Sequence, residues 1–108
     1  MNTQYKKGVL ELCVLSLLQK HDRYGYEISE TLAGHIDIAD GTVYPILRKL
    51  KADGLLTTYL QEESGGPPRK YYTLTARGRE TYQAACAEYL RFARSVKQLL
   101  EDEEHDEK

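Results

Sequence analysis

The chain has 108 residues, which is enough for one domain with a single hydrophobic core and too few for a separate catalytic domain. Its formal net charge of -2 is unevenly distributed, because six of the 17 acidic residues lie in residues 101–108 together with one lysine. Residues 1–100 therefore hold 14 lysines and arginines against 11 acids, a net charge of +3, so the overall charge does not exclude a nucleic acid as partner.

The first predicted element is a helix over residues 6–20 that is apolar on nearly every side. Such a helix must be covered on more than one face, and we expect one face to meet either the C-terminal helix or a second subunit. Glu11 interrupts the apolar run, which is also shorter than the ~20 residues that cross a bilayer. We therefore predict neither a signal peptide nor a membrane segment, and a cytoplasmic location.

Two cysteines, Cys13 and Cys86, stand far apart among apolar residues, and neither has a ligand partner at metal-binding spacing. We predict two reduced thiols, no metal site and no cofactor. The sequence also lacks a glycine-rich phosphate loop and a nucleophile elbow, and no motif gives its three histidines a catalytic partner. These absences predict that the chain is not an enzyme.

Two short helices are predicted next. The first runs from Tyr26 to Ala33 after a loop over residues 21–25, and Gly34 is its expected end. The second lies in the stretch from Ile38 to Leu56, where Gly54 is expected to end it in a left-handed conformation. Its inward stripe has the i, i+3, i+4, i+7 spacing of an amphipathic helix and consists of Val43, Ile46, Leu47 and Leu50. Together the two helices predict a helix-turn-helix.

The other face of that second helix is polar and basic, and we interpret it as a DNA-recognition surface. Cations on such a helix meet phosphates, while shorter polar groups reach the edges of bases. Thr42, Tyr44 and Arg48 are the candidates for contacts with bases or sugars. With two cations of the following hairpin, the predicted DNA-contacting set is Thr42, Tyr44, Arg48, Lys49, Lys51, Arg69 and Lys70.

The start of the recognition helix has two interpretations. Thr42 could cap the helix, which would place Pro45 in the first turn, where its missing N–H is harmless. The helix could instead begin at Asp40, and Pro45 would then bend it near Gly41. We favour the earlier start with a kinked first turn.

A β-hairpin is predicted after the recognition helix. Residues 55–63 and 69–74 are rich in threonine and tyrosine, which favour strands, and Ser64-Gly65-Gly66-Pro67-Pro68 between them is built from turn residues. A helix-turn-helix followed by a hairpin is a winged helix. We expect Tyr26, Tyr71 and Tyr72 mainly to pack this wing against the helices.

The last predicted helix begins after Thr75, a suitable N-cap, and runs to about Leu100. Its apolar residues repeat at intervals of 4, 3, 4, 3 and 4, as in the seam of a coiled coil: Tyr82, Cys86, Tyr89, Ala93, Val96 and Leu100. We favour a dimer seam. Burial against the first helix of the same chain is the competing interpretation, and a wide stripe can serve both partners.

The predicted fold is therefore mainly α with a small β-hairpin, a winged helix-turn-helix followed by a long C-terminal helix. Residues 1–75 are expected to form the DNA-binding domain. Residues 76–108 are expected to form the dimerisation helix and its acidic tail.

Three blocks of sequence resemble the PadR family of bacterial winged-helix transcriptional regulators. They are Tyr24-Gly25-Tyr26-Glu27-Ile28, residues 41–50 with 53–56, and residues 69–75 with Gly78. The resemblance, closest to the short subgroup with a single terminal helix, implies a homodimeric repressor that binds a palindromic operator in double-stranded DNA. It also implies dimerisation through the terminal helix and the first helix, where Leu10 and Val14 are the assigned contacts.

The resemblance further implies release from DNA by a small aromatic effector. Tyr82, Tyr89 and Phe92 could line its pocket, although aromatic residues on an apolar helical stripe more often belong to a core. The chain has no tryptophan with which to stack such a ligand. Two other interpretations stay open: a winged-helix protein-interaction module without DNA binding, and redox sensitivity through Cys86 at the seam.

Overall fold

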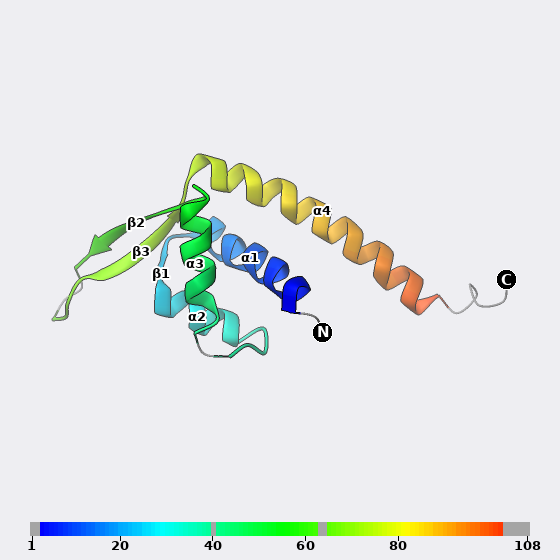
Figure 1. Cartoon of the computed structure of the whole chain (residues 1–108), viewed down its shortest axis with the longest axis horizontal. Coiled ribbons are helices and arrows are strands. Elements are labelled where there is room, and N and C mark those ends of the chain that lie inside the picture. Colours follow the sequence, from blue (N-terminus) through cyan, green and yellow to red (C-terminus); the bar gives the residue numbers. More distant parts are fainter. Residues whose placement is uncertain (1–2, 40, 63–64, 103–108) are drawn as a thin grey trace.

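The computed structural model describes residues 3–39, 41–62 and 65–102. Their order is α1 (Thr3–Lys20), β1 (Arg23–Tyr24), α2 (Gly25–Ala33), α3 (Val43–Ala52), β2 (Leu56–Gln61), β3 (Arg69–Leu74) and α4 (Ala76–Glu101). Figure 1 shows α1, α2 and α3 grouped together, with the β2–β3 hairpin projecting on one side and α4 extending beyond α1 on the other. The predicted fold class, a mainly α winged helix-turn-helix with a long C-terminal helix, is confirmed.

One hydrophobic core joins the first three helices to the hairpin. Its buried members are Leu10, Val14, Leu15, Leu18, Ile28, Leu32, Val43, Ile46, Leu47, Leu50, Leu55, Leu56 and Leu74. The predicted inward stripe of α3 belongs to this core in full, and each of its four side chains is at most 3% exposed. Because a helix buries one face at a time, the polar face of α3 is turned to solvent.

The sheet has three antiparallel strands in the order β1-β3-β2. β2 and β3 pair along all six residues of each strand, which confirms the predicted hairpin. β1 pairs with β3 through Arg23 opposite Tyr72 and Tyr24 opposite Tyr71. The expectation of a simple loop at residues 21–25 was wrong. Two residues are too few to give a strand pattern in the sequence, and they form a strand here because β3 provides their hydrogen-bonding partners.

The recognition helix begins later than expected. α3 starts at Val43, and Gly41 has a φ of +83°, a left-handed conformation that cannot belong to the helix. Thr42 takes the N-cap position without a capping side-chain hydrogen bond, and its N–H donates to the Ala39 carbonyl at 3.2 Å. Pro45 therefore lies in the first turn, where it costs no hydrogen bond. The favoured start at Asp40 was wrong, and Asp40 itself lies outside the described residues.

The junction before α4 connects three elements. As predicted, Thr75 caps α4, since its Oγ1 accepts a hydrogen bond from the Gly78 N–H at 2.9 Å. The same hydroxyl donates to the carbonyl of Gly54 at 2.8 Å, and Gly54 ends α3 with the predicted left-handed φ, +80°. A Cβ built on Gly78 would overlap the Leu55 carbonyl oxygen. Only glycine therefore allows α4 to start this close to β2.

α4 then runs antiparallel to α1 before it leaves the body of the protein (Figure 1). Arg79 donates to the Gln19 side chain at 3.1 Å, and the Tyr82 hydroxyl donates to Ser16 at 3.5 Å. The contacts move toward the N-terminus of α1 as α4 advances, as expected for two antiparallel helices. Over the three described ranges, every helix is too short or too polar to cross a membrane.

Replacing Gly78 with alanine is expected to lower the free energy of unfolding by about 1–3 kcal/mol, because the new Cβ forces α4 away from Leu55. Gly66→Ala is the control, since this glycine between β2 and β3 has no left-handed φ and nothing within 4 Å of a built Cβ. It should leave stability unchanged or raise it by up to about 1 kcal/mol. Urea unfolding at one protein concentration measures both changes, and equal stability of the two variants would contradict the close contact.

Candidate nucleic-acid interface

The outward face of α3 presents Tyr44, Arg48 and Lys51 to solvent. Within the part of the chain that the structure describes, neither Arg48 nor Lys51 forms an ion pair. No carboxylate of the described residues lies within ion-pair distance of either cation, so both can pair with an external anion. The face therefore has the electrostatic character that the sequence predicted.

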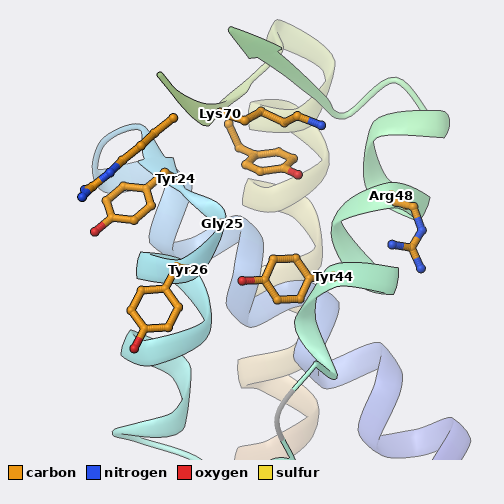
Figure 2. Close-up of a pocket in the computed structure, with 8 residues that line it drawn as sticks. Tyr24, Gly25, Tyr26, Tyr44, Arg48 and Lys70 are labelled. Atoms are coloured by element: carbon orange, nitrogen blue, oxygen red, sulfur yellow. The ribbon is translucent and has the colours of Figure 1, made fainter. Parts of the chain in front are cut away.

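A hollow of about 440 Å³ lies between this face and the wing. It is lined by Tyr24, Gly25, Tyr26, Tyr44, Arg48, Arg69, Lys70 and Tyr72. Figure 2 shows Tyr44 pointing from α3 toward α2, Lys70 extending from β3 above it, and Arg48 on the next turn of α3. The structure thus brings together four of the seven predicted DNA-contacting residues, and none of the lining residues is acidic.

Gly25, at the start of α2, allows the ring of Tyr44 to lie against the backbone. A Cβ built on Gly25 would come within 3.1 Å of Cε1 of Tyr44 and 3.7 Å of Cε1 of Tyr72. A contact of 3.1 Å requires the neighbouring ring to move. Gly25 therefore determines where the Tyr44 side chain sits, a role that the local sequence did not reveal.

The remaining tyrosines of the hollow differ in their surroundings. Tyr72 is half-buried, and burial raises its pKa, with Tyr44 adding to the shift and Arg48 opposing it. Its hydroxyl therefore remains a hydrogen-bond donor to higher pH. Tyr26 was expected to pack the wing but is 58% exposed, and its hydroxyl donates to Glu30 at 2.6 Å, which raises its pKa.

A row of rings crosses the sheet and positions Arg69. The Arg69 guanidinium lies 4.5 Å from the centre of the Tyr24 ring, and Tyr24 meets Tyr71 edge to face at 5.6 Å. Tyr71 stacks on Tyr59 at 5.6 Å, and the Tyr59 hydroxyl donates to Asp22 at 2.8 Å, which raises the pKa of Tyr59. The wing therefore offers a preorganised cation. The sequence analysis did not assign Tyr24 and Tyr59 to the site. Aromatic residues at facing positions of paired strands are the pattern that could have indicated this row of rings.

Lys49 and Thr42 lie apart from the hollow. The Lys49 ammonium is 3.1 Å from Asp53 and 3.4 Å from Glu11, and its hydrogen bond to Asp53, with the charge of Glu11, raises its pKa. This ion pair connects α3 to α1. Thr42 lines a second depression of about 330 Å³, which it shares with Lys6 and Lys7.

The outer half of α4 holds four of the six residues predicted to form a seam, Tyr89, Ala93, Val96 and Leu100. Phe92 is 59% exposed and Leu100 is 79% exposed. One groove along this half is lined by Tyr89, Phe92, Ala93, Val96, Lys97, Leu100 and Glu101. A second groove, between α4 and α1, is lined by Gly8, Val9, Leu12, Ala85, Glu88, Tyr89 and Phe92. Tyr89 and Phe92 are shared by the two grooves.

Three other predicted residues face inward. Leu10 and Val14, assigned to the dimer contact, are 5% and 0% exposed in the core, so they offer no surface to a second chain. Both side chains are covered by the chain's own core, whereas Val9 and Leu12 of α1 line the groove between α1 and α4. Tyr82 packs against the same core and lines neither α4 groove, so the expected aromatic pocket retains Tyr89 and Phe92 only.

The two thiols are free and half-buried, and burial raises the pKa of Cys13, which makes this thiol less reactive. Among residues 3–39, 41–62 and 65–102, no group of three histidine, cysteine or acidic side chains converges as a metal site would require.

Comparisons with known proteins agree with this arrangement. A model of the "Transcriptional regulator PadR-like family" matches residues 14–84. The transcriptional regulator Rv3488 of Mycobacterium tuberculosis is 30% identical over 77 residues, which cover 70% of this chain and 71% of that protein. A protein of Lysinibacillus sphaericus without an assigned function is 29% identical over 99 residues, 88% of this chain and 87% of its own.

Solved structures show the same likeness. A PadR-like transcriptional regulator of Bacillus cereus superimposes with a TM-score of 0.84 at 34% identity and covers 94% of this chain and 100% of its own. A Streptococcus transcriptional regulator gives a TM-score of 0.82 at 34% identity, covering 91% of this chain and 98% of its own.

Gly25→Ala is expected to displace the Tyr44 ring by a few tenths of an ångström while the fold persists, because the new Cβ meets the ring of an exposed side chain. Two-dimensional NMR should show changed ring shifts for Tyr44 and weaker contacts between Tyr44 and Tyr72. Gly34→Ala at the other end of α2 is the control, since its Cβ would meet only ordinary contacts of 3.5 Å and longer. Unchanged Tyr44 shifts in Gly25→Ala would contradict this role.

Proposed function

The chain is a transcriptional regulator of the PadR-like family and not an enzyme, and we propose that it acts as a homodimeric repressor that binds a palindromic operator. The observation that best supports DNA contact is the hollow between α3 and the wing. It gathers Tyr44, Arg48, Arg69 and Lys70 from two separate elements and has no acidic residue in its lining. Such clustering is the electrostatic footprint of a nucleic-acid interface.

In this proposal α3 enters the major groove and the wing lies over the adjacent backbone. Arg48 and Tyr44 face the bases and sugars, while Lys51, Arg69 and Lys70 neutralise phosphates. Thr42 and Lys49 would lie at the margin of the contact. Lys49 would have to exchange its carboxylate partners for a phosphate, so we assign it a smaller share of the affinity.

A second copy of the chain is the partner that we propose for α4. Exposed apolar side chains on its outer half have no cover within the described residues, and such patches mark interfaces. Their heptad spacing suits an identical helix, and a two-fold interface places the same stripe on both partners. Val9 and Leu12 in the α1–α4 groove would replace Leu10 and Val14 as the first-helix contacts. Residues 1–75 would then be the DNA-binding unit and residues 76–108 the dimerisation unit.

Release of DNA by a small aromatic effector completes the proposal. Two places offer aromatic walls, the grooves of α4 with Tyr89 and Phe92, and the hollow between α3 and the wing. The alternative function, a winged-helix protein-interaction module without DNA binding, would not need the unpaired cations of α3. A steep loss of DNA affinity with rising salt separates the two functions.

Tyr44→Ala and Arg48→Ala are each expected to weaken operator binding by roughly tenfold or more, since a base contact contributes about 1–3 kcal/mol of discrimination. Fluorescence anisotropy with a labelled duplex that the unmodified protein binds gives the affinities at one salt concentration. Lys20→Ala is the control, because this exposed cation at the end of α1 lies outside the hollow and outside both α4 grooves. Unchanged affinity in both folded variants would remove the outward face of α3 from the interface.

Val96→Asp combined with Leu100→Asp is expected to convert dimers into monomers, because four carboxylates would meet across the seam. The same variant should bind the operator more weakly, since two half-sites are held by one dimer. Sedimentation velocity measures the mass. Leu60→Asp is the matched control, because Leu60 is equally apolar and 68% exposed but lies on β2. A double variant that still sediments as a dimer would show that α4 is not the main interface.

A further inference from the structure

We propose that the first turns of α1 provide a second DNA-contact surface, in which Lys6, Lys7 and Thr42 bind backbone phosphates on the side of α3 opposite the wing. This inference rests on the proposed function, because it adds residues to the same DNA interface. It also assigns these residues to one part of the operator, the phosphates between the two half-sites.

The surface is a depression of about 330 Å³ between α1 and the first turn of α3. It is lined by Lys6, Lys7, Leu10, Ile38, Ala39, Thr42, Pro45 and Ile46. Lys6 and Lys7 precede Leu10 by four and three residues, a spacing that places all three on one face of the helix. Because Leu10 is buried in the core, both lysines lie at the edge of the depression, where they are exposed.

No described carboxylate is paired with these two lysines. Neither Lys6 nor Lys7 forms an ion pair within residues 3–39, 41–62 and 65–102, and none of the described residues that line the depression is acidic. Glu11, one turn beyond Lys7 on α1, lies 3.4 Å from the Lys49 ammonium. Lys49 is therefore compensated within the chain, whereas Lys6 and Lys7 can pair with an external anion.

The geometry of α3 places this surface and the wing on opposite edges of one exposed face. Successive residues of an α-helix are rotated by about 100° around its axis. Tyr44 consequently lies at the edge that faces the wing, whereas Thr42 and Lys49 lie at the edge that faces α1. Arg48 lies between the two edges. Figure 1 shows the same order, with the β2–β3 hairpin and α1 on opposite sides of α3.

The chemistry of the depression suits a sugar–phosphate backbone. The two ammonium groups pair with phosphates as point charges. The Thr42 hydroxyl makes no capping hydrogen bond, so it can donate to a phosphate oxygen. Ile38 and Ala39 offer apolar surface to the carbon atoms of a deoxyribose. Contacts of this kind carry no base information, so they raise the affinity for any duplex without changing sequence preference.

The position of α1 relative to α4 assigns the surface to the middle of the operator. Gly8 and Val9, which follow the two lysines, line the groove that α1 shares with Tyr89 and Phe92 of α4. In the proposed dimer this part of α4 lies at the two-fold axis, so the lysines of α1 lie nearer the axis than the wing does. The α1 surfaces would then meet the phosphates between the half-sites, and the wings would meet the outer flanks.

The first test compares the salt dependence of DNA binding by the full chain and by the double variant Lys6→Gln with Lys7→Gln. We expect at least about fivefold weaker binding at low salt, and a slope of log affinity against log salt that is less steep by about 2, since each phosphate contact contributes about 0.9. The ratio of affinities for operator and unrelated duplex should stay constant within about twofold. Lys20→Gln is the control, an exposed lysine of α1 outside the depression, and should leave the slope unchanged.

Two results of that comparison would overturn the surface. One is an unchanged slope in the glutamine variant, and the other is a loss of affinity confined to the operator. Lys6→Arg with Lys7→Arg provides the charge-preserving variant, and it should keep the affinity of the unmodified chain. Equal losses in the arginine and glutamine variants would show that positive charge is not what these positions supply.

The second test is phosphate ethylation interference with the unmodified chain, on an operator recovered by selection from random DNA. We expect ethylation of the phosphates between the half-sites to weaken binding. In the glutamine variant this interference should disappear, while interference at the outer flanks remains. Absence of central interference in the unmodified chain would overturn the proposal, whatever the stability of the variants.

Failure of this inference and failure of the proposed function give different results. If the unmodified chain binds no DNA, both fail. If it binds an operator and loses affinity in Arg48→Ala, but shows neither the change of slope nor the central interference, only the surface on α1 fails.

Discussion

Burial of the apolar stripe of α3 is the interaction on which the rest of the structure depends. Val43, Ile46, Leu47 and Leu50 are all in the core, so the helix has no freedom to rotate about its axis. Its polar face then lies outside this core, with Tyr44 turned toward Gly25 at the start of α2 and Arg48 exposed on the next turn of α3 (Figure 2). Burial of the apolar face of α3 therefore determines which residues of α3 form the surface proposed to read DNA.

The same core also sets the position of the wing and of α4. Leu56 and Leu74 anchor the hairpin where β2 begins and β3 ends, so Lys70 and Tyr72 of β3 face α3 across the hollow. Thr75 and Gly78 then tie α4 to the end of α3 and the start of β2. In a dimer formed along α4, the separation of the two recognition helices would follow from this junction.

The sequence predicted features that depend on local pattern and missed those that depend on distant neighbours. The α3 stripe, the hairpin and the Thr75 cap were predicted correctly, because periodicity and capping chemistry are local. β1 was missed because its two residues become a strand only beside β3. Likewise, the pairing of Lys49 with Glu11 joins residues far apart in the chain and has no signature in the charge pattern. The left-handed conformation of Gly41 makes α3 begin at Val43. The sequence could not reveal this conformation, because a glycine at this position also fits a helix with a kinked first turn.

In the proposed dimer, two copies of α3 read a symmetric DNA site. Selection of bound sequences from random duplex DNA by the purified full chain would reveal that symmetry. We expect an inverted repeat whose half-sites lie one helical turn apart, about 10–10.5 base pairs from centre to centre, or a multiple of that spacing. Recovery of no enriched sequence, or of a single half-site without its inverted copy, would contradict it.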